Sequence, residues 1–149
     1  MLRYLQKLKK KNYFSFVLIG DGECNEGSIW EAAMTGAKYK LNNLVAIVDK
    51  NGFQQTGSTN DIMDMGSLEE KWKSFGWDTI SIDGHDIISL FGVLDKKKLT
   101  EKKLPTAIIA NTKKGKGISF IENNNEWHHN LLTKSQYDQA ILELGFKND

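Results

Sequence analysis

The sequence contains little cysteine and proline, no excess of one charge and no long apolar run. Its single cysteine, Cys24, cannot form an intrachain disulfide. The 20 Lys and Arg residues balance 19 Asp and Glu residues, so no global field favours nucleic acid, an anionic membrane or an acidic substrate, and any anion must be bound by local groups. No stretch approaches the roughly 18 apolar residues that suggest a membrane-spanning helix, and residues 1–11 carry no apolar run able to act as a signal sequence. We therefore expect a cytoplasmic protein.

A chain of 149 residues, of which 40% are hydrophobic, can bury one core, which predicts a single domain over residues 1–149. Short apolar runs rich in Val, Ile or Phe predict strands at residues 14–19, 44–48, 79–82 and 107–110. Apolar residues recur with helical spacing between these runs, within residues 29–41, 68–75 and 87–94. The alternation of strands and helices predicts an α/β fold of three layers, with a largely parallel sheet flanked by helices.

The remaining segments are less regular. Residues 135–144 predict a closing helix, capped by Thr133 or Ser135. The longest polar connection, residues 54–66, is a candidate ligand or partner loop, because long loops in compact domains are often functional. The lysine-rich runs at residues 7–11 and 96–103 are typical of solvated helix flanks.

Polar residues follow two of the predicted strands, at the edge where parallel sheets bind ligands. Gly20, Asp21 and Gly22 come directly after the first strand, and Asn51 follows the second. The two glycines permit a tight turn and the close approach of a bulky ligand, and the helix start that follows offers unpaired N–H groups to an anion. Carboxylate and amide oxygens are hard ligands of the kind that Mg²⁺ takes together with phosphate oxygens and water. The pairing of the two motifs therefore predicts a site for a metal–diphosphate complex.

This pattern resembles the thiamine diphosphate motif, because Asn51 follows Asp21 by 30 residues across one βαβ unit. The runs GDGECNEGSIWEAA and AKYKLNNLVAIVDKNGFQQTG are most similar to transketolases, particularly to the amino-terminal domain or subunit of those made from two separate polypeptides. The similarity covers residues 12–144. The resemblance implies thiamine diphosphate as the cofactor, with Mg²⁺ (or Ca²⁺ or Mn²⁺) as the metal.

The resemblance also assigns roles to residues around the turn. Asp21, the side chain of Asn51 and the carbonyl of Phe53 would hold the metal. The cofactor-binding turn would consist of Gly20, Asp21 and Gly22. Glu23 is a further cofactor-binding candidate, although it also fits a charge that is favourable to the helix dipole.

Three further polar groups match transketolase motifs. Glu26 and Glu31 correspond to two glutamates that link the paired active sites near the transketolase dimer interface, although Glu31 also fits a solvated helix residue. Lys114 lies in the TKKGKG run that resembles the loop over the cofactor, where it would screen diphosphate charge; a flexible basic turn is the alternative. His128 resembles the histidine beside the diphosphate and the reacting substrate oxygen, and imidazole suits proton transfer near neutral pH. His129 stands where many relatives have glycine, and two adjacent histidines also fit an exposed loop.

Other conspicuous residues are expected to be structural. We expect Asp86 to cap the following helix, with His85 satisfied locally or at an interface. Cys24 has no histidine nearby in sequence, so we do not expect it to be a nucleophile. Three tryptophans are expected to pack in the core or against a partner: Trp30, Trp72 and Trp77.

The resemblance implies that catalysis needs more than this chain. In transketolases, a pyrimidine-binding domain supplies the glutamate that activates the cofactor, and no segment here resembles that domain. The relatives also begin well before the GDG strand, so we expect a domain that is incomplete at its N-terminus, an exposed sheet edge, and a partner subunit or domain in a homo- or hetero-oligomer. The expected reaction is transfer of a two-carbon ketol unit between sugar phosphates. Three alternatives remain: 2-oxo acid decarboxylation, deoxyxylulose phosphate synthesis, and a catalytically silent assembly or regulatory module.

Overall fold

The computed structural model describes residues 13–146, and the lysine run at residues 7–11 therefore lies outside the described part of the chain. The strands are β1 (Ser15–Gly20), β2 (Leu44–Lys50), β3 (Phe53–Gln54), β4 (Gly57–Ser58), β5 (Asp78–Asp83) and β6 (Thr106–Asn111). The α-helices are α2 (Gly27–Lys38), α3 (Thr59–Met63), α4 (Leu68–Ser74), α5 (Ile87–Leu94), α6 (Lys96–Glu101) and α7 (Lys134–Glu143). Two short 3₁₀ helices complete the set, η1 (Glu23–Asn25) and η2 (Asn125–His128).

The four predicted strands form one parallel sheet in the order β1-β2-β6-β5. The central strand β6 is buried along nearly its whole length, as expected for a parallel strand covered on both faces. The register pairs Gly20 with Asp49 and Lys50 with Asn111. The carboxyl ends of β1, β2 and β6 therefore meet at one edge of the sheet.

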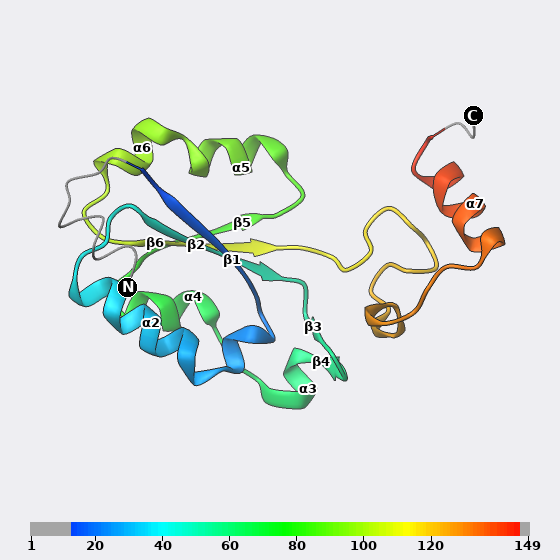
Figure 1. The fold of residues 1–149 in the computed structure, drawn as a ribbon, viewed down its shortest axis with the longest axis horizontal. Coiled ribbons are helices and arrows are strands. Elements are labelled where there is room, and N and C mark those ends of the chain that lie inside the picture. Colours follow the sequence, from blue (N-terminus) through cyan, green and yellow to red (C-terminus); the bar gives the residue numbers. More distant parts are fainter. Residues whose placement is uncertain (1–12, 147–149) are drawn as a thin grey trace.

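Helices cover the sheet on both faces (Figure 1). The crossings through α2 and α4 lie on one face, and α5 and α6, which lead from β5 back to β6, lie on the other. This follows from the right-handedness of parallel crossovers, since a chain that reverses direction along the sheet must place its helices on the opposite face. The predicted three-layer α/β fold is confirmed.

Aromatic packing fixes the layer formed by α2 and α4. The rings of Trp30 and Phe75 stack with centroids 5.1 Å apart, and those of Trp72 and Trp77 meet edge to face at 4.7 Å. The indole N–H of Trp77 donates to the carbonyl of Ala33 in α2 (2.9 Å). The tryptophans that were expected in the core or at a partner surface therefore belong to the core cluster, Trp30 as its partly buried member.

The helix boundaries follow local capping signals. The Asp86 carboxylate accepts from the Ile88 N–H and caps α5, as predicted. Thr133 caps α7 in a reciprocal capping box with Gln136, which settles the choice between Thr133 and Ser135. Asp95 caps α6, a short helix inside the lysine run that was expected to be a solvated helix flank. The polar connection at 54–66 contains β3, β4 and α3 rather than being an open loop.

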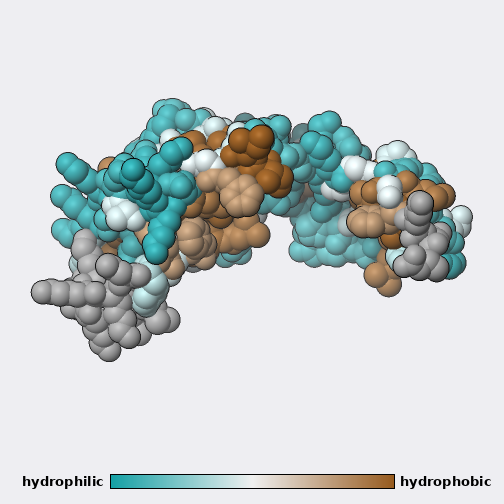
Figure 2. Space-filling view, turned by 90° about the horizontal axis from the view of Figure 1, so that it is seen from above, coloured by the Kyte–Doolittle hydropathy of each residue, from teal (hydrophilic) through white to brown (hydrophobic). Residues whose placement is uncertain are grey.

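Apolar side chains are exposed on both an edge strand and a helix of the layered part of the fold. On β1, the edge strand of the sheet within residues 13–146, Phe16 and Leu18 are 52% and 72% exposed. On α5, Ile88 and Phe91 are 83% and 75% exposed. Figure 2 shows hydrophobic side chains gathered on the face that carries α5.

The segment with η2 and α7 lies beyond the carboxyl ends of the strands, apart from the sheet (Figure 1). Within this segment, α7 is held to the preceding loop by Glu143, whose carboxylate accepts from both the backbone N–H and the hydroxyl of Ser119. Within residues 13–146, no helix is long and apolar enough to cross a membrane.

Candidate functional site

Asp21 joins the ends of β1 and β2. It is only 4% exposed. Its Oδ2 accepts from the Gly52 N–H at 2.8 Å and its Oδ1 from the Gly22 N–H at 3.0 Å, while its own N–H donates to the Asp49 carbonyl at 3.1 Å. The two predicted motifs therefore meet at one sheet edge.

The electrostatics of this corner favour a cation. Burial raises the pKa of the Asp21 carboxyl above its ordinary value, hydrogen bonds from Gly52 and Gly22 oppose that shift, and the neighbouring Asp49 carboxylate adds to it. A divalent ion would relieve both the burial of the charged form and the repulsion between the two carboxylates.

Asn51 is held with its amide in a defined orientation. Its Oδ1 accepts from the Phe53 N–H at 2.9 Å, and its Nδ2 donates to Asp49 Oδ2 at 3.3 Å. Asp49 was not among the residues predicted from sequence. The sequence feature that could have identified Asp49 is its place at the end of a buried strand, two residues before Asn51.

The glycine turn is shaped by the β3–β4 hairpin. A Cβ on Gly22 would lie 2.5 Å from the Gln54 Cβ, so only glycine fits. The Asn25 amide nitrogen donates to Gln54 Oε1 (2.9 Å), and its Oδ1 is buried without a hydrogen-bond partner in the structure. Glu23 extends its carboxylate back over the turn and accepts from the Gly20 N–H at 3.2 Å. The turn thus has a closely packed backbone at Gly22 and a buried oxygen, Asn25 Oδ1, that accepts no hydrogen bond within the structure.

These groups fit a hard divalent ion shared with phosphate. No three His, Cys, Asp or Glu side chains within residues 13–146 gather as a metal-binding group. The oxygen donors at the corner are instead the Asp21 carboxylate and the Asn51 amide, with Phe53 in the adjoining strand β3. Mg²⁺ commonly takes one or two carboxylates and completes its octahedron with phosphate oxygens and water.

A pocket of about 470 Å³ opens beside this corner, at the carboxyl ends of the strands. Its polar lining includes Asp49, Asn51, His85, Thr112 and Lys114, with an apolar floor from β1, β2 and α5. The His85 Nε2 accepts from the Lys113 N–H at 2.8 Å, so His85, expected to be satisfied locally or at an interface, has a partner within this chain, 28 residues away. This bond anchors the start of the TKKGKG loop.

The structure brings Lys114 and His128 together. The Lys114 Nζ lies 3.3 Å from His128 Nδ1. Because an ammonium group only donates, Nδ1 is the acceptor and Nε2 carries the proton. Burial, together with the positive charges of Lys114 and His129, lowers the pKa of His128. The lowered pKa favours the neutral imidazole, whose Nε2–H is then able to donate to an oxygen anion.

A contact missed in the sequence joins η2 to the hairpin. The Asn125 amide donates to the Gln54 carbonyl (2.9 Å) and accepts from the Gly57 N–H (3.0 Å), in the orientation that satisfies both groups. The segment that carries His128 is thereby fixed to the hairpin that packs on Gly22.

Glu26, Glu31 and Cys24 stand apart from this cluster. Glu26 and Glu31 are exposed, at the start of α2 and within it, and Glu26 accepts from the Ser28 hydroxyl at 3.3 Å. Neither lines the pocket. Cys24 is fully buried, and burial raises the pKa of its thiol to about 12, which agrees with the expectation that it is not a nucleophile.

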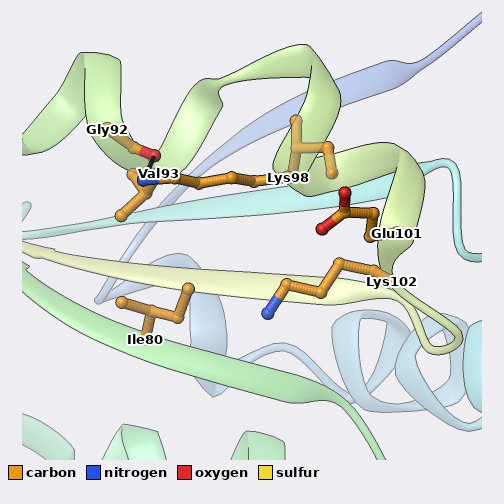
Figure 3. A pocket seen from close by; sticks show the side chains of 7 residues that line it. Ile80, Gly92, Val93, Lys98, Glu101 and Lys102 are labelled. Atoms are coloured by element: carbon orange, nitrogen blue, oxygen red, sulfur yellow. Dashed lines mark hydrogen bonds between the residues drawn. The ribbon is translucent and has the colours of Figure 1, made fainter.

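A second pocket, of about 410 Å³, lies between α5, α6 and β5 (Figure 3). Its two lysines are already engaged: the Lys98 Nζ donates to the Gly92 carbonyl at 3.2 Å, and Lys102 pairs with Asp78. Its other lining is mainly apolar, and it contains none of the predicted site residues.

Comparisons with known proteins agree with this geometry. Residues 6–149 match the family described as transketolase, thiamine diphosphate binding domain. The chain is 45% identical over 141 residues to an apulose-4-phosphate transketolase subunit of Phocaeicola vulgatus, covering 93% of this chain and 49% of that protein. It is 39% identical over 135 residues to human transketolase, covering 91% of this chain and 21% of that protein.

The fold comparison gives the same result. The structure of transketolase from Campylobacter jejuni matches with a TM-score of 0.86 at 25% identity, covering 97% of this chain and 23% of that one. The chain thus spans about half the length of the Phocaeicola vulgatus relative and about a fifth of human transketolase. Since the family match covers nearly the whole chain, the protein belongs to the transketolase family, and the part of transketolase that it matches is the thiamine diphosphate-binding domain.

Proposed function

We propose that this chain supplies the metal–diphosphate side of a transketolase active site. The observation that carries the proposal is the meeting of Asp21 and Asn51 at adjacent strand ends, joined by the 2.8 Å bond from the Gly52 N–H to Asp21. In the proposed site, Asp21, Asn51 and the Phe53 carbonyl hold Mg²⁺, and Gly20 and Gly22 leave room for the diphosphate. Glu23, over the same turn, orders the glycine backbone.

The loop residues complete the anion site in this proposal. Lys114 lines the pocket beside Asn51 and would offset diphosphate charge. His128, whose Nδ1 accepts from Lys114, would donate its Nε2 proton to a diphosphate or substrate oxygen and could move a proton there. Thiamine diphosphate, when bound, supplies the carbanion chemistry, and the protein's part is to bind it, orient it and exclude water.

The proposed reaction is transfer of a two-carbon ketol unit between sugar phosphates, carried out with a partner that binds the pyrimidine. One relative is named as one subunit of an apulose-4-phosphate transketolase, and another, 41% identical over 129 residues, as a subunit of the 6-deoxy-6-sulfo-D-fructose transketolase of a Clostridium strain. Such names support an enzyme made of more than one polypeptide. Glu26 and Glu31, exposed at the start of α2 and within it, are available to such a partner or to a second protomer.

Calorimetric titration with thiamine diphosphate, with and without Mg²⁺, tests the cofactor site. We expect binding that requires Mg²⁺ and is lost in Asp21→Ala. Asp138→Ala is the matched control, because Asp138 pairs with Lys134 on the surface of α7, apart from the candidate site. Metal-independent binding, or equal binding by Asp21→Ala, would contradict the proposed site. Binding without ketol transfer after a pyrimidine-binding subunit is added would favour the assembly or regulatory role.

A further inference from the structure

Asn51 lies at the end of a chain of polar contacts that none of the roles above requires. Its Nδ2 donates to Asp49 Oδ2 at 3.3 Å, and the other oxygen of Asp49, Oδ1, accepts from the hydroxyl of Thr112. Thr112 also donates its backbone N–H to the Lys50 carbonyl at 3.1 Å. The end of β2 and the residue after β6 are thus linked by both backbone and side chains.

This chain of contacts determines which end of the Asn51 amide faces which neighbour. A terminal amide can turn over and exchange its oxygen and nitrogen with little change in shape, so only its hydrogen bonds select the orientation. The Asp49 carboxylate only accepts and therefore selects the amide nitrogen, and the Phe53 N–H only donates and therefore selects the amide oxygen. Both neighbours favour the same orientation.

Thr112 fixes Asp49 in turn. The Thr112 methyl group packs closely against Gly84, where an added Cβ would lie 2.5 Å from the Thr112 Cγ2. The next residue, Lys113, is held by the bond from its N–H to His85 Nε2 (2.8 Å). The residues at the ends of β5 and β6 therefore hold the Thr112 methyl group and the backbone that follows it, which sets the position of the hydroxyl in the free protein.

We infer that Asp49 and Thr112 are positioning residues that present the Asn51 amide oxygen to the divalent ion without contacting it. The inference rests on the proposed function and deepens it, since it assigns the groups behind the metal ligand. Partners of this kind typically change metal affinity by about 10- to 100-fold when removed.

The test compares Thr112→Val with Thr112→Ser and Thr100→Val. Valine keeps the shape and loses the hydroxyl, serine keeps the hydroxyl, and Thr100 makes a similar bond to the Lys96 carbonyl on remote α6. We expect Mg²⁺-dependent affinity for thiamine diphosphate to fall by about 10- to 100-fold in Thr112→Val and to change little in the other two variants. Equal affinity in Thr112→Val and wild type would overturn the inference.

A double-mutant cycle makes the test specific to Asn51. If Thr112 acts through Asn51, adding Thr112→Val to Asn51→Ala should cause no further loss of affinity. Additive losses would show that Thr112 acts by another route and would overturn the inference.

NMR of the wild-type protein without ligand provides a further test. It requires neither cofactor binding nor the folding of a variant. In wild type, the side-chain amide protons of Asn51 and the hydroxyl proton of Thr112 should exchange slowly with solvent, because each group donates to Asp49. Rapid exchange of these protons would overturn the inference. Slow exchange together with a failure to bind cofactor would instead reject the proposed function and leave the positioning contacts established.

Discussion

The carboxylate of Asp21, after β1, accepts a 2.8 Å hydrogen bond from the N–H of Gly52, after β2. Parallel pairing of β1 with β2 brings these two turns together, and Asp21 is buried there at 4% exposure. A buried carboxylate is stable when it is paired, hydrogen-bonded or bound to a metal. Asp21 therefore organises the corner in the free protein and leaves it favourable to a cation.

Gly22 is predicted to tolerate no side chain. In Gly22→Ala the new Cβ would lie 2.5 Å from the Gln54 Cβ, so the hairpin must move. We expect the free energy of unfolding, measured by urea denaturation, to fall by about 1–3 kcal/mol, with a loss of cofactor binding. Gly27→Ala is the control, because nothing lies within 4 Å of its added Cβ. A similar loss of stability in both variants would mean that the hairpin contact is not the cause.

The anchoring of α7 should depend on pH through Glu143. Hydrogen bonds from the Ser119 N–H, the Gln139 amide and the Ser119 hydroxyl lower the pKa of Glu143 below its ordinary value of 4.5. A group with a lowered pKa in the folded state stabilises above its unfolded pKa and loses that effect as the pH falls through the folded value. The Ser119 amide NMR signal should therefore titrate below pH 4.5. Glu143→Gln should remove the transition, and titration at or above the ordinary value would contradict the anchor.

The exposed edge strand should promote self-association. Phe16 is 52% exposed on β1, whose outer side pairs with no other strand within residues 13–146. We expect Phe16→Lys to reduce the concentration-dependent light scattering of the isolated chain. Leu131→Lys is the comparison, because Leu131 is 90% exposed but lies outside the sheet. If Leu131→Lys reduced scattering as much as Phe16→Lys, general hydrophobicity rather than the edge would be responsible.

The sheet and the main pair of site residues could be predicted because both depend on local patterns. Short apolar runs indicate buried parallel strands, and ligands gather where such strands end. Asp21 and Asn51 follow consecutive strands of one βαβ unit, so their proximity required only that β1 and β2 be neighbours. The pairing of β1 with β2 fulfils that condition.

The supporting residues depend on contacts that local patterns do not encode. Asp49 meets Thr112 only because β6 inserts between β2 and β5, and the two residues are 63 positions apart. Gln54 reaches Gly22 because the short hairpin folds back over the turn. The segment that forms α6 was expected to be a polar helix flank. Its lysines dominate the sequence pattern, and Leu99, its one buried residue, is too little apolar content to indicate a helix.

Paramagnetic relaxation by Mn²⁺ in the presence of thiamine diphosphate tests the central claim most directly, because it locates the metal. Mn²⁺ accepts the same oxygen ligands as Mg²⁺. We predict that the amide NMR signals of Gly22 and Gly52 broaden first, that those of α7 do not, and that excess Mg²⁺ reverses the effect. Broadening centred elsewhere, or none at all, would contradict a metal–diphosphate site at the ends of β1 and β2.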